Sequence, residues 1–261
     1  MNLLIDDYTL FKKKIKELIG IDLDGYKDEQ IKRRVKILMD RVGAHNFLSF
    51  YKAIEKDQQL RKDFIDKVTI NVSEFFRNTD QFDLLKNKII PELRNRFKKL
   101  SIWSAGCSYG NEPYSVAIIL DELGIREFNM LATDIDMEAL KKAKEGIYKL
   151  EELKNITEER LKRYFTKLDN DHYKISDRIR LSVRFEYLDL LKDKYPKGMH
   201  LILCRNVIIY FTQEAKDGVF RKLAESLEED GILFLGNTER IFNPQNYKLK
   251  PVDLFFYKKV V

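Results

Sequence analysis

Hydrophobic residues recur every three or four positions along the first 70 residues of the chain, which is the spacing of one helix face. No alternating strand pattern and no glycine-rich loop interrupts this stretch. Four helices are predicted: the first ends near Gly20, and the others cover about 27–42, 47–54 and 58–68. Asp24-Gly25 marks a turn and Gly43 a helix end. The pattern predicts a small helical bundle.

The pattern changes after a connecting segment at about 69–80 and an amphipathic helix at 81–99. From Leu100 onward, short apolar runs alternate with helical patterns, which indicates an α/β fold with a mostly parallel sheet. Between about 163 and 186, three short runs predict a small antiparallel β insert at 165–167, 173–175 and 179–185. A further strand, predicted at 183–187 and followed by Asp189, overlaps the last of these runs. Two domains are therefore expected, a helical domain at 1–70 and an α/β domain at 71–261.

The stretch 102–115, IWSAGCSYGNEPYS, places a small-residue loop between a predicted strand and a predicted helix start. Such loops bring backbone N–H groups close to a ligand, and Gly106 and Gly110 permit the tight turn. Glu112 would repel a phosphate and attract a cation, which favours S-adenosylmethionine over a dinucleotide. The glycine spacing is not G-x-G-x-x-G, so a nicotinamide dehydrogenase is disfavoured. The alternative is an ordinary corner in which Glu112 stabilises a helix N-terminus.

Asp134 ends the second predicted strand, 24 positions after Gly110. An acidic residue about 20 positions beyond the glycine loop is placed to hydrogen-bond ribose hydroxyls. An aspartate after a strand is otherwise usually a helix N-cap, and Asp136 is available for that role. The loop and Asp134 together indicate a nucleoside-containing ligand more strongly than either does alone.

Composition narrows the classes of protein. The chain is 44% hydrophobic and 34% charged, as in soluble domains, and no apolar run approaches the roughly 20 residues of a membrane span. Cys107 and Cys204 are too few for a cysteine-ligand metal site or a disulfide framework, so we expect no metal and a cytoplasmic protein without a signal peptide. The net charge of +6 permits nucleic acid and fits an acidic protein partner equally well.

Several motifs resemble those of the chemotaxis receptor glutamate O-methyltransferases, the CheR family, in the same order and over nearly the whole chain. The segment NVSEFFR at 71–77 is similar to the family's N-x-T-x-F-F-R, and SAGCSYGNEPYSVA is similar to its adenosylmethionine loop. The later segments ATDID, LILCRNVIIYF and GNTE also match. The resemblance implies a helical bundle followed by a Rossmann-like methyltransferase domain. It implies S-adenosylmethionine as cofactor, S-adenosylhomocysteine as product and methyl-accepting chemotaxis receptors as partners.

The resemblance also implies the site residues. Arg77 and Tyr210 would lie nearest the transferred methyl group and are the expected catalytic residues. Glu112 would meet the cationic end of the cofactor, Asp134 the ribose and Asp189 the adenine. The expected cofactor-binding residues are Asn71, Ser73, Arg77, Gly106, Glu112, Asp134, Asp189, Leu190, Arg205 and Asn206. This chain departs from the family pattern at Ser73 (usually Thr), Asp189 (usually Asn) and Asn237 (commonly His).

The substrate would be a glutamate carboxylate, which is ionised at neutral pH and needs no general base. The receptor's methylated helices are acidic, and the second predicted helix carries opposite charge. Its expected docking residues are Lys32, Arg33, Arg34, Lys36 and Arg41. The alternative for this helix is an ordinary solvated face. The β insert lacks the glycine-rich turn of family members that bind a receptor's C-terminal pentapeptide, so we expect no such tethering.

Two other functions compete with receptor methylation. A nucleic-acid methyltransferase would need a motif such as Asn/Asp-Pro-Pro-Tyr/Phe to receive a flipped base, and the sequence has none. A non-catalytic regulator that binds S-adenosylmethionine would not need Arg77 and Tyr210, which are both retained. We therefore expect no nucleic-acid partner. We also expect a monomer that reaches the membrane only through its receptor.

Overall fold

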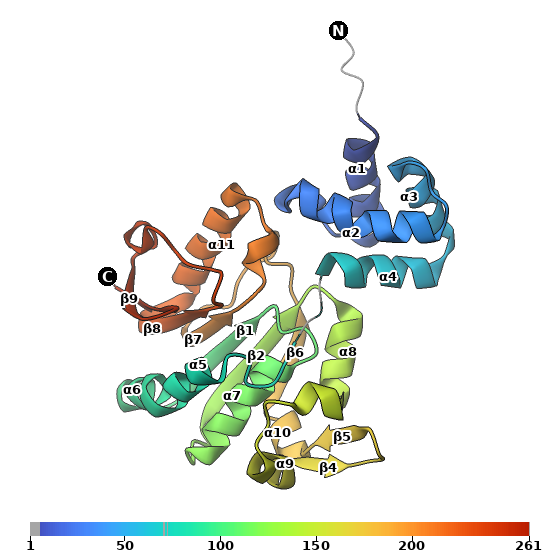
Figure 1. Ribbon diagram of the computed structural model, residues 1–261. Helices are drawn as coiled ribbons and strands as arrows, with labels where there is room; N and C mark the ends of the chain where they lie inside the picture. Colours follow the sequence, from blue (N-terminus) through green and yellow to red (C-terminus); the bar gives the residue numbers. More distant parts are fainter. Residues whose placement is uncertain (1–5, 70, 72, 261) are drawn as a thin grey trace. The chain divides into compact units, whose positions relative to one another are not determined.

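The structure is a computed structural model that describes residues 6–69, 71 and 73–260. The chain divides into two compact units (Figure 1). The helical unit comprises the described residues up to Asn71 together with Tyr210–Val219. The sheet unit comprises the described residues from Ser73 to Ile209 and from Phe220 onward. The helical unit is thus built from two segments that are far apart in the sequence.

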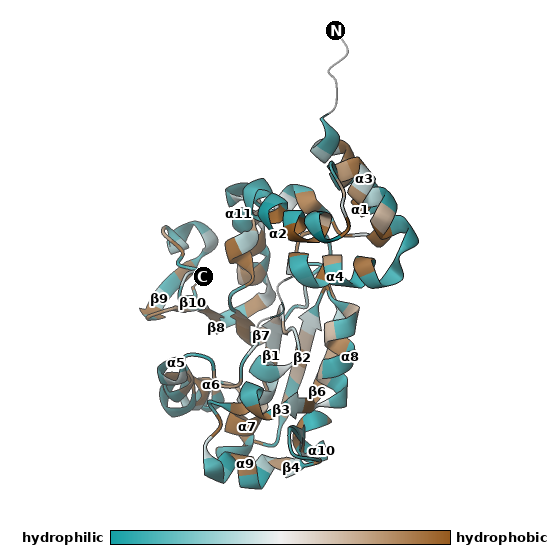
Figure 2. Ribbon diagram, turned by 45° about the vertical axis from the view of Figure 1, so that its right-hand side comes forward, coloured by the Kyte–Doolittle hydropathy of each residue, from teal (hydrophilic) through white to brown (hydrophobic). Residues whose placement is uncertain are grey.

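The helical unit contains the predicted bundle. Its first helix is capped at the N-terminus by Asp6, whose carboxylate accepts the N–H groups of Tyr8 and Thr9, and at the C-terminus by Gly20, where φ is +78°. Apolar residues on each helix enclose a core in which Phe11 and Phe64 meet edge to face, with ring centroids 5.9 Å apart. Figure 2 shows both hydrophobic and hydrophilic residues on each helix, as expected for amphipathic helices. The elements are α1 (Asp7–Ile19), η1 (Leu23–Gly25), α2 (Asp28–Arg41), α3 (Phe47–Lys56) and α4 (Gln58–Thr69).

The sheet unit is built on a seven-stranded sheet with the order β6-β2-β1-β7-β8-β10-β9. The first five strands in that order are mutually parallel, and β10 is antiparallel to both of its neighbours, β8 and β9. The carboxyl ends of the five parallel strands therefore lie along one edge, where α/β proteins bind ligands. The strands are β1 (Leu100–Ala105), β2 (Phe128–Asp134), β6 (Val183–Tyr187), β7 (Met199–Cys204), β8 (Leu227–Leu235), β9 (Leu249–Asp253) and β10 (Phe256–Lys259).

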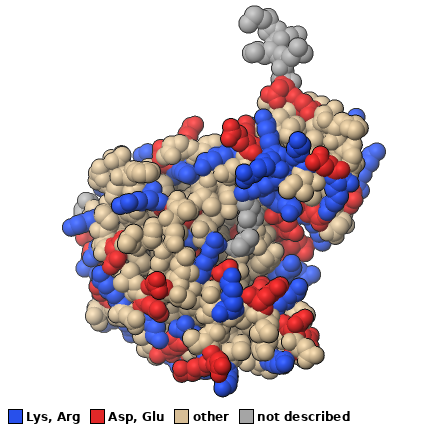
Figure 3. Space-filling view, viewed as in Figure 1, with Lys and Arg blue, Asp and Glu red and all other residues tan. Residues whose placement is uncertain are grey.

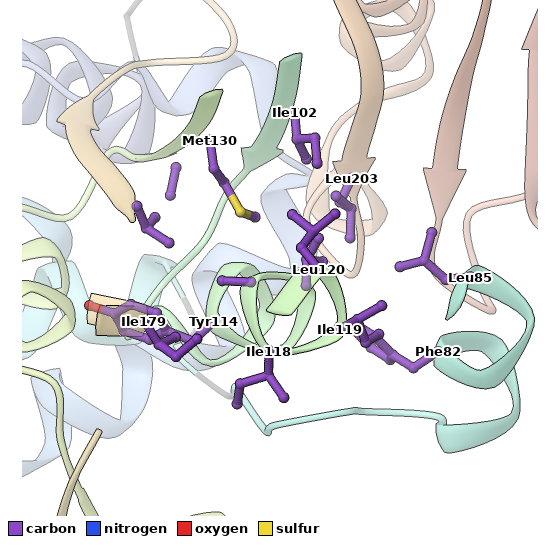
Figure 4. Close-up of a cluster of buried hydrophobic side chains, with 14 of the residues drawn as sticks. Phe82, Leu85, Ile102, Tyr114, Ile118, Ile119, Leu120, Met130, Ile179 and Leu203 are labelled. Atoms are coloured by element: carbon purple, nitrogen blue, oxygen red, sulfur yellow. The ribbon is translucent and has the colours of Figure 1, made fainter. Parts of the chain in front are cut away.

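Helices cover this sheet and complete its core. Figure 4 shows Leu120 of α7 directed toward strand residues such as Leu203, and Ile119 of the same helix beside the α5 residue Phe82. The helix start predicted within 102–115 is α7, which begins at Asn111. The helical elements are α5 (Thr79–Leu84), the π-helical turn η2 (Leu85–Ile89), α6 (Ile90–Arg96), α7 (Asn111–Glu122), α8 (Met137–Glu145), α9 (Glu158–Tyr164), α10 (Asp177–Arg180), η4 (Ile208–Tyr210), α11 (Gln213–Ser226) and η5 (Pro244–Tyr247).

The small antiparallel sheet differs from its prediction. Its order is β3-β5-β4, and its strands are β3 (Ile147–Lys149), β5 (His172–Ile175) and β4 (Phe165–Lys167), with η3 (Leu150–Leu153) beside them. The predicted third strand at 179–185 is wrong, because Ile179 lies in α10 and Val183 begins β6 of the main sheet. β6 pairs in parallel with β2, and its residues Val183 and Phe185 are buried. A three-residue strand such as β3 is too short to show a period.

Asp121 of α7 joins the insert to the main core. Its side chain is 3% exposed and accepts hydrogen bonds from the Tyr164 hydroxyl at 2.9 Å and from Arg178 Nη2 at 2.8 Å. Arg126 and Arg163 also contact it. Burial raises the pKa of the Asp121 carboxyl, but these partners outweigh burial and hold it below its usual value. Within the described part of the chain, no helix has the length and apolar character of a membrane span.

We predict that Asp121→Ala lowers the free energy of unfolding by about 1–3 kcal/mol, because the buried Tyr164 hydroxyl loses its acceptor. The three half-exposed arginines become hydrated when the carboxylate is removed, so the loss of their ion pairs adds little to the change in unfolding free energy. Asp177→Asn is the control, since the Asp177 carboxylate that pairs with Arg180 is 64% exposed and such a pair contributes less than about 1 kcal/mol. Urea unfolding of both variants measures the difference. Equal losses would contradict an anchoring role for Asp121.

Candidate active site

The predicted glycine loop follows β1 and is tied to the end of β2. The N–H groups of Gly106 and Cys107 donate to the Thr133 carbonyl at 2.8 and 2.9 Å. Gly106 has φ +80°, and a Cβ added to it would lie 2.4 Å from Val207 Cγ2. Gly110 then caps α7 with φ +82°. Position 106 therefore requires glycine for both its backbone conformation and its close packing.

Asp134, expected to hold a ribose, lies at the end of β2 beside this loop. Its Oδ2 accepts the N–H of Ser108 at 2.7 Å, and its Oδ1 accepts the N–H of Asp136 at 2.9 Å. Burial raises its pKa to about 6, although both N–H groups favour the anion. Asp136 caps α8 through the N–H groups of Glu138 and Ala139, as predicted. Asp134 therefore fixes the conformation of the loop through these hydrogen bonds. Its carboxylate has further lone pairs that can accept a ribose hydroxyl.

Glu112 lies in the first turn of α7, where its side chain is 13% exposed. Its Oε1 accepts the Ser104 hydroxyl at 2.8 Å, and its Oε2 lies 3.4 Å from Arg205 Nη1. Burial raises the pKa of the Glu112 carboxyl, and the Arg205 charge opposes this. The 3.4 Å separation is long for a charge-assisted hydrogen bond, so Glu112 can accept a second cationic donor.

Arg205 connects Glu112 to the segment that carries Arg77. Its Nη2 donates to the Arg77 carbonyl at 2.9 Å and to Asn78 Oδ1 and Gln81 Oε1 at 3.0 Å each. The Arg205 side chain is 2% exposed, and burial lowers the pKa of its guanidinium. Arg205, predicted to contact the cofactor, therefore joins Glu112 to the backbone at Arg77.

The backbone on both sides of Arg77 is left-handed. Phe76 has φ +48° and Asn78 has φ +64°, which non-glycine residues seldom adopt. The Phe76 N–H donates to the Ser115 hydroxyl of α7 at 2.9 Å, and Arg205 holds the next two residues. Strained conformations persist where the surroundings fix them, and they cluster at functional sites. Ser73, a few residues earlier, is half-buried.

The predicted adenine-side residues follow β6. Asp189 is 3% exposed, and its Oδ1 accepts the N–H of Leu191 at 2.8 Å. Leu190 is buried, and its carbonyl accepts the Tyr195 hydroxyl at 2.6 Å. The Leu188 N–H donates to the Asp134 carbonyl at 3.1 Å, so this turn lies beside the predicted ribose residue.

Glu239 is a buried carboxylate that the sequence analysis did not single out. It is 4% exposed and accepts four backbone N–H groups. Those donors and their distances are Asn206 (2.5 Å), Val207 (2.7 Å), Ile208 (2.9 Å) and Gly236 (3.0 Å). Asn206, a predicted cofactor residue, has φ +62°, so the turn after β7 depends on this carboxylate. Glu239 ends the GNTE segment, which was a signal that could have identified it.

Two of the predicted residues belong to the helical unit. Asn71 is half-buried there, and its Nδ2 donates to the Thr69 hydroxyl at 3.2 Å. Tyr210 is the last residue of η4 and lies against α2, with the Arg34 Cζ atom 4.6 Å from its ring centroid. The other predicted cofactor residues belong to the sheet unit.

The sheet unit suits S-adenosylmethionine better than a phosphate ligand. Glu112 and Asp134 place two buried carboxylates at the carboxyl edge of the sheet, beside the loop at Gly106. A carboxylate stabilises the ammonium or sulfonium charge and accepts ribose hydroxyls, whereas it repels phosphate. Glu112 would hold the cationic end of the cofactor, and Asp134 its ribose.

We predict that Glu239→Gln weakens S-adenosylmethionine binding by about tenfold or more, because its amide presents N–H groups to backbone N–H donors and disturbs the turn at Asn206. Calorimetry measures the dissociation constant, and melting temperature reports the fold. Thr238→Ala, a neighbouring exposed position, is the control and retains wild-type affinity. A folded Glu239→Gln protein with unchanged affinity would contradict the assignment.

Comparison with known proteins gives the family. The CheR methyltransferase all-alpha domain matches residues 6–69, and the CheR methyltransferase SAM binding domain matches residues 71–255. The chain is 41% identical over 255 residues to a chemotaxis protein methyltransferase of Listeria innocua, covering 97% of each. It is 35% identical over 241 residues to that of Escherichia coli, covering 87% of this chain and 83% of the relative. The chain belongs to the CheR family of S-adenosylmethionine-binding chemotaxis methyltransferases.

Proposed function

We propose that this protein transfers a methyl group from S-adenosylmethionine to glutamate carboxylates of chemotaxis receptors, forming methyl esters. The observation that carries the proposal is the link through Arg205 between Glu112, expected at the cofactor, and the backbone of Arg77, expected at the substrate. Family membership supports the same activity.

The proposed chemistry needs positioning and no general base. S-adenosylmethionine supplies a methyl group on a positively charged sulfur. The glutamate carboxylate is ionised at neutral pH and is already the nucleophile. Arg77 would orient it through its planar guanidinium, and Tyr210 through its hydroxyl. Because water stabilises the separated charges more than the charge-dispersed transition state, a site that excludes water accelerates the reaction.

We propose that α2 docks the acidic receptor helix. Lys32, Arg33 and Lys36 are exposed on α2, and Figure 3 shows Lys and Arg side chains gathered over this helix. Arg41 is also exposed but is paired with Asp63 of α4. Arg34 is half-buried against Tyr210, so it is not equivalent to the exposed three. Charges of this kind raise the encounter rate and set orientation.

We predict that reversing two charges, Lys32→Glu with Lys36→Glu, raises the KM for receptor at least about threefold and leaves cofactor affinity unchanged. The effect shrinks as salt rises, because the Debye length falls to about 8 Å at physiological ionic strength. Lys52→Glu with Lys56→Glu on α3 makes the same net charge change at exposed positions and is the control. Identical receptor kinetics in both double variants would exclude α2 as the docking face.

The proposed activity is tested by incubating the protein with radiolabelled S-adenosylmethionine and membranes that contain chemoreceptors. Label should appear in the receptor and be released as methanol by mild base, because carboxyl methyl esters hydrolyse readily. Base-stable label would indicate an N-, C- or ether-linked product and contradict glutamate methylation. Tight S-adenosylhomocysteine binding without any label would favour a non-catalytic regulator.

A further inference from the structure

The segment that carries Tyr210 is bound along the start of α2. Tyr26 and Phe211 form an isolated antiparallel bridge, and their rings meet edge to face with centroids 5.1 Å apart. Both side chains are buried. Two backbone hydrogen bonds of 2.9 Å flank the bridge: Lys27 N–H to the Tyr210 carbonyl and Thr212 N–H to the Gly25 carbonyl. The main chain around Tyr210 is therefore fixed by the helical unit.

The Tyr210 side chain also contacts α2, through Arg34. The Arg34 Cζ atom lies 4.6 Å from the ring centroid, within the range of a cation–π contact. Burial lowers the pKa of the Arg34 guanidinium, and the interaction with Tyr210 opposes this. Its Nη1 is buried without a hydrogen-bond partner among the described residues, so the ring is a main partner that offsets its burial.

We infer that Arg34 is a positioning residue for Tyr210, and that α2 couples receptor docking to the orientation of the catalytic hydroxyl. This inference rests on the proposed function. A guanidinium over the ring face restricts rotation of the ring and hence the position of the hydroxyl. Orientation matters in a reaction that has no general base, because small displacements of positioning groups can cost about a hundredfold in rate.

The geometry of α2 explains the coupling. Ile31, Val35 and Leu38 point into the core of the helical unit, whereas Lys32, Arg33 and Lys36 are exposed. Arg34 lies between these faces and is the cation of this group that contacts Tyr210. A receptor helix bound to the exposed face would therefore act on the same rigid helix that holds Tyr210.

The test compares Arg34→Met and Arg34→Lys with the control Lys52→Met, an exposed change on α3. Arg34→Met should lower kcat about tenfold or more, with unchanged KM for receptor and unchanged S-adenosylmethionine affinity. Arg34→Lys should recover part of the loss, because it keeps the charge but not the planar contact. A raised receptor KM with unchanged kcat would instead assign Arg34 to the docking face and overturn the inference.

A double-mutant cycle separates positioning from general support of the fold. Tyr210→Phe keeps the ring and removes the hydroxyl. If Arg34 acts by orienting that hydroxyl, Arg34→Met has little further effect on kcat in the Tyr210→Phe background. Losses that multiply would show that the two residues act independently, and would overturn the inference.

Amide hydrogen exchange of the unliganded protein tests the contact without any activity. The Lys27 and Thr212 amides, which make the flanking hydrogen bonds, should exchange faster in Arg34→Met than in wild type or Lys52→Met. If the wild-type protein methylates no chemoreceptor, that result counts against the proposed function alone. The inference about Arg34 is still tested, because hydrogen exchange reports on its contact without any activity. Unchanged exchange together with unchanged kcat would overturn the inference while the function stands.

Discussion

The buried guanidinium of Arg205 is the interaction on which the sheet unit's candidate site depends. It joins the end of β7 to Glu112 after the glycine loop and to the backbone at Arg77 and Asn78. The rings of Phe82 and Phe234 lie against its faces, at 5.2 and 4.5 Å from its Cζ atom. A buried cation is costly unless it is well paired, so these acceptors stabilise one arrangement of three distant segments.

A second buried charge serves the same edge of the sheet. The Glu239 carboxylate gathers four backbone N–H groups and holds the left-handed turn at Asn206. Gly236 permits this approach, because a Cβ there would lie 2.6 Å from Glu239 Oε2. The positions of the loops around the candidate site are thus set by fixed charges and backbone hydrogen bonds, which suits a reaction that depends on orientation.

The helical unit has a part in the proposed chemistry beyond docking. Tyr210 belongs to it by its contacts, although the residues just before it belong to the sheet unit. The exposed cations of α2 suit an acidic partner, while Arg34 of the same helix contacts the Tyr210 ring. In the proposed function, one helix would therefore link recognition of the receptor to the placement of Tyr210.

The sequence by itself determined what depends on near neighbours. Hydrophobic periodicity located the helices and the parallel strands, Asp136 was identified as a cap, and the glycine loop marked the ligand edge. Tertiary structure decided the rest. Whether 183–187 joined the insert or the main sheet depended on β2. The partners of Glu239, Arg205 and Arg34 lie 29 or more positions away, apart from the nearby Gly236. Such contacts form only when distant segments meet in the folded protein, so local sequence patterns do not predict them.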